Sequence, residues 1–265
     1  MKCDDCVRFN ELLHGSRGVQ AMRDSVARAR VEEAKIHRKM VKDDRQVIAN
    51  GTAPDDRAKA DGTPLNFVFM SADAANQDGM TLPAEWPPTH GGERGYRERQ
   101  KCMGVSIEGQ RMDTYMTPQT LNSGSNLVCT GLHLSLTRLF DNVCKDSDRR
   151  YIDFLHLQVD NCVGENKNNV LITFLSTLVA RGVIGTVEVN FMRVGRTHIN
   201  IDQIFSRFTE GVRGRSIFMR SQQSGILKAS YTNVPVNVVC LRNLGKFKVL
   251  FLPAMKRIPN ISKPR

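Results

Sequence analysis

Three carboxylates stand where segments of regular structure are predicted to begin or end. Asp73 follows the apolar run Leu65–Met70, Asp160 follows a second apolar run, Phe154–Val159, and Asp202 lies near the start of an amphipathic segment. Hard cations such as Mg²⁺ prefer oxygen ligands, so converging carboxylates suit them. Two such ions about 3.5–4 Å apart can promote cleavage of a phosphodiester. The pattern predicts a site for two Mg²⁺ or Mn²⁺ ions, with strand-end turns and favourable helix-start charges as the alternative roles of these acids.

The segment that follows Asp160 is unusually polar. A helix is predicted directly after it, and the free N–H groups at a helix N-terminus attract phosphate. Asparagine and lysine side chains could add to that attraction, whereas ordinary helix capping would account for only one or two of them. We therefore predict nucleic-acid contacts from four of these residues, namely Asn161, Asn166, Lys167 and Asn168.

A histidine and an arginine lie shortly before Asp202. His198 is placed in the catalytic set, because a histidine can ligate a metal, transfer a proton or donate to a phosphate. A lone histidine is more often structural, and that alternative stays open. Arg196 is placed with the nucleic-acid contacts.

The elements that must position these residues can be read from the periodicity of apolar residues. Alternation predicts strands, and a three-to-four spacing predicts helices. The predicted order is β-β-β-α-β-α-β-α, which is the RNase H-like arrangement, a mixed five-stranded α/β sheet preceded by an N-terminal helical extension. In such a sheet the strands that end at Asp73 and Asp160 are neighbours. The predicted strands are 65–70, 102–108, 111–119, 154–159 and 187–191.

Charge divides the chain into three regions. We predict a helical extension over residues 1–62, a core over 63–213 and a basic segment over 214–265. Residues 203–265 contain 12 Lys and Arg against the single acid Glu210, which equals the net charge of +11 of the whole chain. A block this one-sided predicts contact with a polyanion such as nucleic acid, DNA foremost. A solubilising tail is the alternative.

Composition excludes some classes of protein. No apolar run approaches the roughly 20 residues needed to span a bilayer, and the first residues are not those of a secretory signal. Seven cysteines, an odd number and mostly isolated, predict reduced thiols and a nuclear or cytoplasmic protein. Cys3 and Cys6 form a CxxC that supplies half of a tetrahedral zinc site, but no matching pair follows at finger-like spacing.

Three motifs resemble an uncharacterised, transposon-derived domain family of eukaryotes. The runs are DAANQDGMTLP at Asp73–Pro83, LQVDNCVGENKNN at Leu157–Asn169 and FMRVGRTHINIDQIFSRF at Phe191–Phe208. The family is similar to DDE-type transposases and integrases of RNase H-like fold. The resemblance implies metal-dependent DNA cleavage and strand transfer, with Asp73, Asp160 and Asp202 as metal ligands. It also marks Asn161, Asn166, Lys167, Asn168 and His198 as motif residues whose role is open.

Two positions depart from the family's pattern. Asn76 stands where an Asp is expected and Arg196 where a His is expected. Asparagine carries no carboxylate charge and arginine does not ligate metals. The alternative function is therefore a degenerate, catalytically inactive module that binds nucleic acid. No complete DNA-binding domain is evident in the sequence, which would suit a fragment of a longer protein encoded by a transposable element. Assembly into a homo-oligomer is left open.

Overall fold

A computed structural model describes residues 65–75, 80–84, 97–121, 124–143, 151–192, 200–232 and 234–255. Within these ranges the protein is α/β, with a mixed seven-stranded sheet and five helices. The predictions for the helical extension and its CxxC, and those for Asn76, Arg196 and His198, lie outside the described residues.

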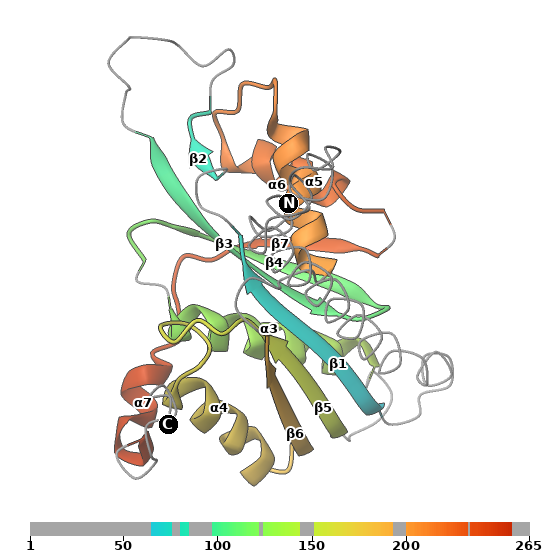
Figure 1. Cartoon of the computed structure of the whole chain (residues 1–265), viewed down its shortest axis with the longest axis vertical. Coiled ribbons are helices and arrows are strands. Elements are labelled where there is room, and N and C mark those ends of the chain that lie inside the picture. The colour runs from blue at the N-terminus through green and yellow to red at the C-terminus, as the bar shows by residue number, and fades with distance from the viewer. Residues whose placement is uncertain are drawn as a thin grey trace, which may run out of the picture.

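The sheet combines an antiparallel half with a parallel half (Figure 1). Its order is β6-β5-β1-β3-β4-β7, and β2 pairs with β3 off this path. β1, β3 and β4 are successively antiparallel, whereas β5 is parallel to β1, β6 to β5 and β7 to β4. The strands are β1 (Leu65–Ala74), β2 (Thr81–Leu82), β3 (Glu98–Ile107), β4 (Arg111–Pro118), β5 (Ile152–Val159), β6 (Ile184–Phe191) and β7 (Val236–Cys240).

Helices cover both faces of the sheet (Figure 1). One face packs against α3, α4 and α7, and the other against α5 and α6. None of the described helices is both long enough and apolar enough to cross a membrane. The helices are α3 (Ser125–Val143), α4 (Asn169–Ala180), α5 (Asn200–Val212), α6 (Arg220–Ala229) and α7 (Phe247–Met255).

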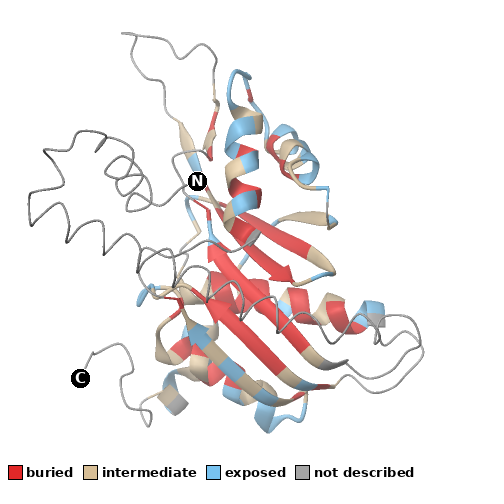
Figure 2. Ribbon diagram, turned by 45° about the vertical axis from the view of Figure 1, so that its right-hand side comes forward, coloured by how far each residue is buried: buried red, intermediate tan, exposed pale blue. Residues whose placement is uncertain are grey.

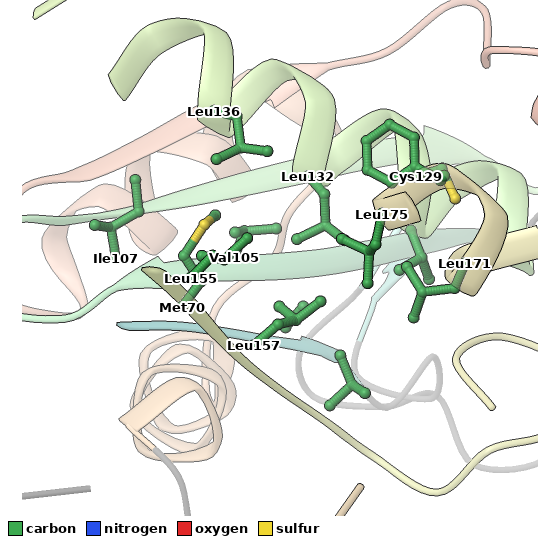
Figure 3. Packing of buried hydrophobic residues seen from close by; sticks show 14 of the residues in the cluster. Met70, Val105, Ile107, Cys129, Leu132, Leu136, Leu155, Leu157, Leu171 and Leu175 are labelled. Carbon is green, nitrogen blue, oxygen red and sulfur yellow. The ribbon is translucent and has the colours of Figure 1, made fainter. Parts of the chain in front are cut away.

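The main core lies between the sheet and the α3–α4 layer. Alternate residues of β1 and β5 face it, and Met70, Leu155 and Leu157 are at most 1% exposed there. Leu132 of α3 and Leu171 of α4 complete the contact (Figure 3). Burying each such side chain contributes about 1.5–3 kcal/mol. The central strands are accordingly buried along most of their length, whereas the edge strand β6 is not (Figure 2).

Gly104 of β3 allows α5 to lie close to the opposite face. It pairs with Asp73 of β1. A Cβ at this position would lie 2.5 Å from Met112 Cε, 3.0 Å from Ile201 Cγ2 and 3.2 Å from Phe205 Cζ. Ile201 and Phe205 belong to α5, so the absence of a side chain at Gly104 sets how closely that helix approaches the end of β1.

Gly104→Ala is expected to destabilise the protein by about 1–3 kcal/mol, because an overpacked core forces its neighbours to shift. Urea denaturation measures the change in the free energy of unfolding. The matched control is Gly225→Ala in α6, where an added Cβ meets nothing within 4 Å and helix propensity favours alanine by about 1 kcal/mol. Equal effects of the two substitutions would contradict the packing role of Gly104.

The number of strands differs from the predicted five. The two further strands are β2, which is too short to leave a periodic pattern, and β7, which lies within the basic segment 214–265. β7 pairs in register with β4 from Met112–Val236 to Met116–Cys240. The sequence pattern missed β7 because its residues are only half-buried and its partner lies more than 100 residues away in the chain.

Candidate functional site

Asp73 and Asp160 lie side by side at one edge of the sheet. β1 and β5 are parallel neighbours, and Ala72 pairs with Val159. The residues that follow this pair are the two aspartates, so both carboxylates emerge where the strands end. The prediction that these strands are neighbours is confirmed. Open α/β sheets place their sites at this edge, beyond the carboxyl ends of the strands.

Asp202 reaches the same place from α5. It lies in the first turn of this helix, which Ile201 and Phe205 seat over Gly104, the residue that pairs with Asp73. The side chain of Asp202 hydrogen-bonds that of Asp73, and the charges of Asp202 and Asp160 both act on Asp73. The three predicted carboxylates are thus gathered by two strands and one helix that are distant in sequence.

The surroundings of Asp73 disfavour its ionised form. Burial raises the pKa of Asp73 to about 8, and the neighbouring charges of Asp202 and Asp160 act in the same direction. The backbone N–H of Ala74 donates to Asp73 Oδ1 at 2.8 Å and opposes that rise. Asp73 is only 9% exposed. Carboxyl groups whose pKa is shifted by burial together with a specific neighbouring charge cluster at functional sites, so Asp73 is a candidate functional residue.

Asn166 positions Asp160. Its Nδ2 donates to Asp160 Oδ1, and the backbone N–H of Cys162 donates to the same oxygen at 3.2 Å. Asn166 is 3% exposed, and its hydrogen bond directs the side chain to Asp160. In this position the buried side chain of Asn166 orients Asp160, and its contact with nucleic acid stays a prediction.

The other predicted contact residues differ in their surroundings. Asn168 caps α4: its Oδ1 accepts from the N–H groups of Val170 at 3.1 Å and Leu171 at 3.2 Å. Capping was the alternative for this polar run, and it accounts for Asn168. Lys167 holds its Nζ 5.9 Å from the centre of the Phe191 ring. Asn161 is half-buried beside Asp160.

Comparison with known proteins assigns the family. A family model described as a domain of unknown function, DUF7869, matches residues 99–265. The chain belongs to this family. The DUF7869 match includes Asp160 and Asp202, whereas Asp73 precedes it on the central strand of the same sheet. Searches of curated proteins and of solved structures found no match to the chain.

The donor atoms of this DUF7869 protein fit a hard cation. Asp73, Asp160 and Asp202 offer carboxylate oxygens, and Asn166 Oδ1 is a buried acceptor to which no described group donates. Oxygen ligands of this kind suit Mg²⁺ or Mn²⁺. Among the described residues, no three His, Cys, Asp or Glu side chains already have metal-binding geometry. One carboxylate is held by Asn166 and two share a hydrogen bond, so an ion would draw these side chains together.

Sequence reasoning missed two charged residues of the DUF7869 site. Glu165 and Lys101 line a pocket beside Asp73, together with Asn166. The pKa of Glu165 is raised by burial and by the charge of Asp160, while Lys101 acts to lower it. Glu165 stood within the polar run after Asp160, which was a usable signal. No sequence signal marked Lys101, because it reaches the site from β3, a different strand.

Proposed function

We propose that this protein is a transposase- or integrase-type enzyme that cleaves and transfers phosphodiesters of nucleic acid, DNA foremost, with Mg²⁺ or Mn²⁺. The observation that carries the proposal is the gathering of Asp73, Asp160 and Asp202 at the ends of β1 and β5, where Asp73 is buried among like charges. That arrangement destabilises the metal-free protein and becomes favourable once cations are present.

The proposed fold is RNase H-like. Its support is the strand order, in which three adjacent antiparallel strands, β1, β3 and β4, are followed in the chain by β5 and β6 on the other side of β1. The two strands that were not predicted leave this order intact: β7 lies at its end, beside β4, and β2 pairs with β3 off the path.

The residues of the site have separate roles in the proposed cleavage of a phosphodiester. Bound divalent ions supply activation of an attacking hydroxyl and stabilisation of the oxygen that leaves phosphorus. Asp73 and Asp160 would hold the ions, and Asp202 would complete the set from α5. Asn166 keeps the carboxylate of Asp160 in one orientation through its hydrogen bond. The new bond forms between the attacking oxygen and phosphorus as the bond to the leaving oxygen breaks.

The proposed partner is nucleic acid, and the proposed location is the nucleus. The net charge of +11 is concentrated in residues 203–265. Arg213 and Arg215 follow the helix that supplies Asp202, and both are largely exposed to solvent. Exposed arginines that follow this helix would contact the phosphate backbone, and such contacts weaken steeply as salt concentration rises.

The second candidate is a nucleic-acid-binding module without catalysis. The observation in its favour is the same concentration of positive charge, which can supply affinity for a polyanion without chemistry.

Asp160→Asn is expected to lower the rate of DNA cleavage by on the order of 10²-fold or more, as when a group that stabilises transition-state charge is removed. The assay uses purified protein, end-labelled DNA, and Mg²⁺ or Mn²⁺. The matched control is Asp153→Asn, the same change at an exposed position near the other end of β5, which should leave the rate unchanged.

Cleavage that survives Asp160→Asn would refute the metal mechanism. Salt-sensitive DNA binding by wild-type protein that never cleaves DNA under any of these conditions would favour the binding module instead.

A further inference from the structure

The segment between α5 and α6 exposes two large apolar side chains next to each other. Phe218 and Met219 are each 58% exposed, and Phe218 is the one aromatic among the largely exposed apolar residues of the described ranges. A single exposed apolar residue is ordinary at a protein surface, whereas contiguous apolar surface often marks a site of interaction. The pair therefore indicates a surface that contacts a partner.

The backbone that carries this pair is fixed on both sides. Before it, Ile217 is 2% exposed, and its N–H and carbonyl groups form hydrogen bonds of 2.6 and 2.7 Å with the backbone of Ala84. After it, Gln222 Oε1 accepts from the backbone N–H groups of Phe218 at 2.8 Å and Met219 at 3.0 Å. Because this backbone is already ordered, less conformational entropy is lost when the two side chains bind. The pair is thus preorganised for contact.

Positive charge flanks the pair along the chain. Residues 213–220 include three arginines and no acid, and Arg213 and Arg215 are exposed. Arg220 directly follows the pair and forms an ion pair of 3.0 Å with Glu98, so the charge of that acid is already compensated. Phosphates attract exposed arginines, and the steps between bases accept apolar side chains. The combination of charge and apolar surface therefore matches nucleic acid.

We propose that Phe218, with Met219 beside it, inserts between neighbouring base pairs of duplex nucleic acid while Arg213 and Arg215 contact the adjoining phosphates. Insertion of apolar side chains such as these unstacks a base step and bends the duplex by about 20–90°. The segment follows α5, whose first turn carries Asp202. The inference rests on the proposed function for the choice of nucleic acid as partner, and it adds the contact through which the protein deforms that partner.

Binding of a short DNA duplex to the full chain, without divalent ions, tests the insertion. Fluorescence anisotropy at several salt concentrations measures affinity, and energy transfer between dyes at the two ends of the duplex measures bending. Phe218→Ala is expected to abolish the bend and to weaken binding by roughly 5- to 100-fold, the usual effect of removing an aromatic side chain that stacks on a base. The salt dependence should stay unchanged, because no phosphate contact is lost. Phe218→Leu retains a large apolar side chain and should keep most of the bend.

Two further substitutions serve as controls. Arg213→Ala is expected to lower the slope of log affinity against log salt concentration by about 1 while the bend is retained. Leu250→Ala removes a side chain that is 68% exposed on α7, which covers the other face of the sheet (Figure 1), and it should change neither affinity nor bending. Circular dichroism verifies that each variant folds.

The outcomes separate this inference from the proposed function. If Phe218→Ala binds and bends DNA as wild type does, or if wild type leaves the duplex straight, the inference fails, while cleavage that Asp160→Asn abolishes would still support the proposed function. If the bend depends on Phe218 but DNA is never cleaved with Mg²⁺ or Mn²⁺, the inference stands and the proposed catalysis fails. A wild-type dimer that Phe218→Ala dissociates, seen by analytical ultracentrifugation, would assign the pair to a contact between copies of the chain and overturn the inference. Absence of any DNA binding would overturn both.

Discussion

Asp73→Asn is expected to make the metal-free protein more stable at pH 8 while abolishing its proposed activity. Burial, with the charges of Asp202 and Asp160, raises the pKa of Asp73 to about 8, whereas an unfolded chain titrates this group near its ordinary value of about 3.9. The folded protein therefore retains a proton that the unfolded chain has lost, and stability falls as pH rises between these two values.

The size of the expected difference in stability follows from the separation between the folded and unfolded pKa values of Asp73. Below about pH 3 the carboxyl group is largely protonated in both states, so the stabilities of the wild type and the variant should respond to pH alike. Near pH 8 the variant should be more stable by on the order of a few kcal/mol. Urea denaturation from pH 4 to 8 in the presence of a chelator measures the difference in the free energy of unfolding between wild type and variant.

Two controls separate the cluster from general effects of charge. Asp153→Asn, at an exposed position, should show no such trend with pH. Addition of Mg²⁺ at pH 8 should stabilise wild type, because the ion binds only the folded state, and should stabilise Asp73→Asn much less. A variant that is less stable than wild type across the whole range would show that Asp73 has a structural role and not a strained, functional one.

Asp113→Ala is expected to lower the free energy of unfolding by about 3–5 kcal/mol, the usual cost of breaking a buried charge pair. Asp113 is fully buried. Its Oδ1 accepts from Arg138 Nη1 at 3.1 Å and Asn237 Nδ2 at 3.0 Å, and Arg111 Nε lies 3.3 Å from its Oδ2. One carboxylate thus joins β4, α3 and β7.

Thermal or urea denaturation measures the effect, and Glu188→Ala serves as the control. Glu188 is 59% exposed and pairs with His156 at 3.4 Å, so its loss should cost no more than about 1 kcal/mol. A similar, small effect of both substitutions would contradict the role of Asp113 in attaching β7 to the sheet. Because β7 belongs to the sheet, truncation at residue 214 would damage the fold, and the salt dependence of DNA binding is better tested by substitution of Arg213 and Arg215.

Local patterns in the sequence were enough to predict most elements and the strand ends that carry two of the acids. Alternation in β1 and β5, and the helical spacing in α4, are properties of neighbouring residues, so they can be read without knowledge of the fold. The order of elements then predicted that the strands of Asp73 and Asp160 would be neighbours, which the pairing of Ala72 with Val159 confirms.

The surroundings of those acids depend instead on tertiary packing. The approach of Asp202 depends on the space over Gly104, the orientation of Asp160 depends on buried Asn166, and the pocket of Glu165 depends on Lys101 from another strand. The pairing of β7 with β4 likewise joins segments more than 100 residues apart. These contacts arise from packing between distant parts of the chain, and a local pattern of hydrophobic and polar residues carries no record of them.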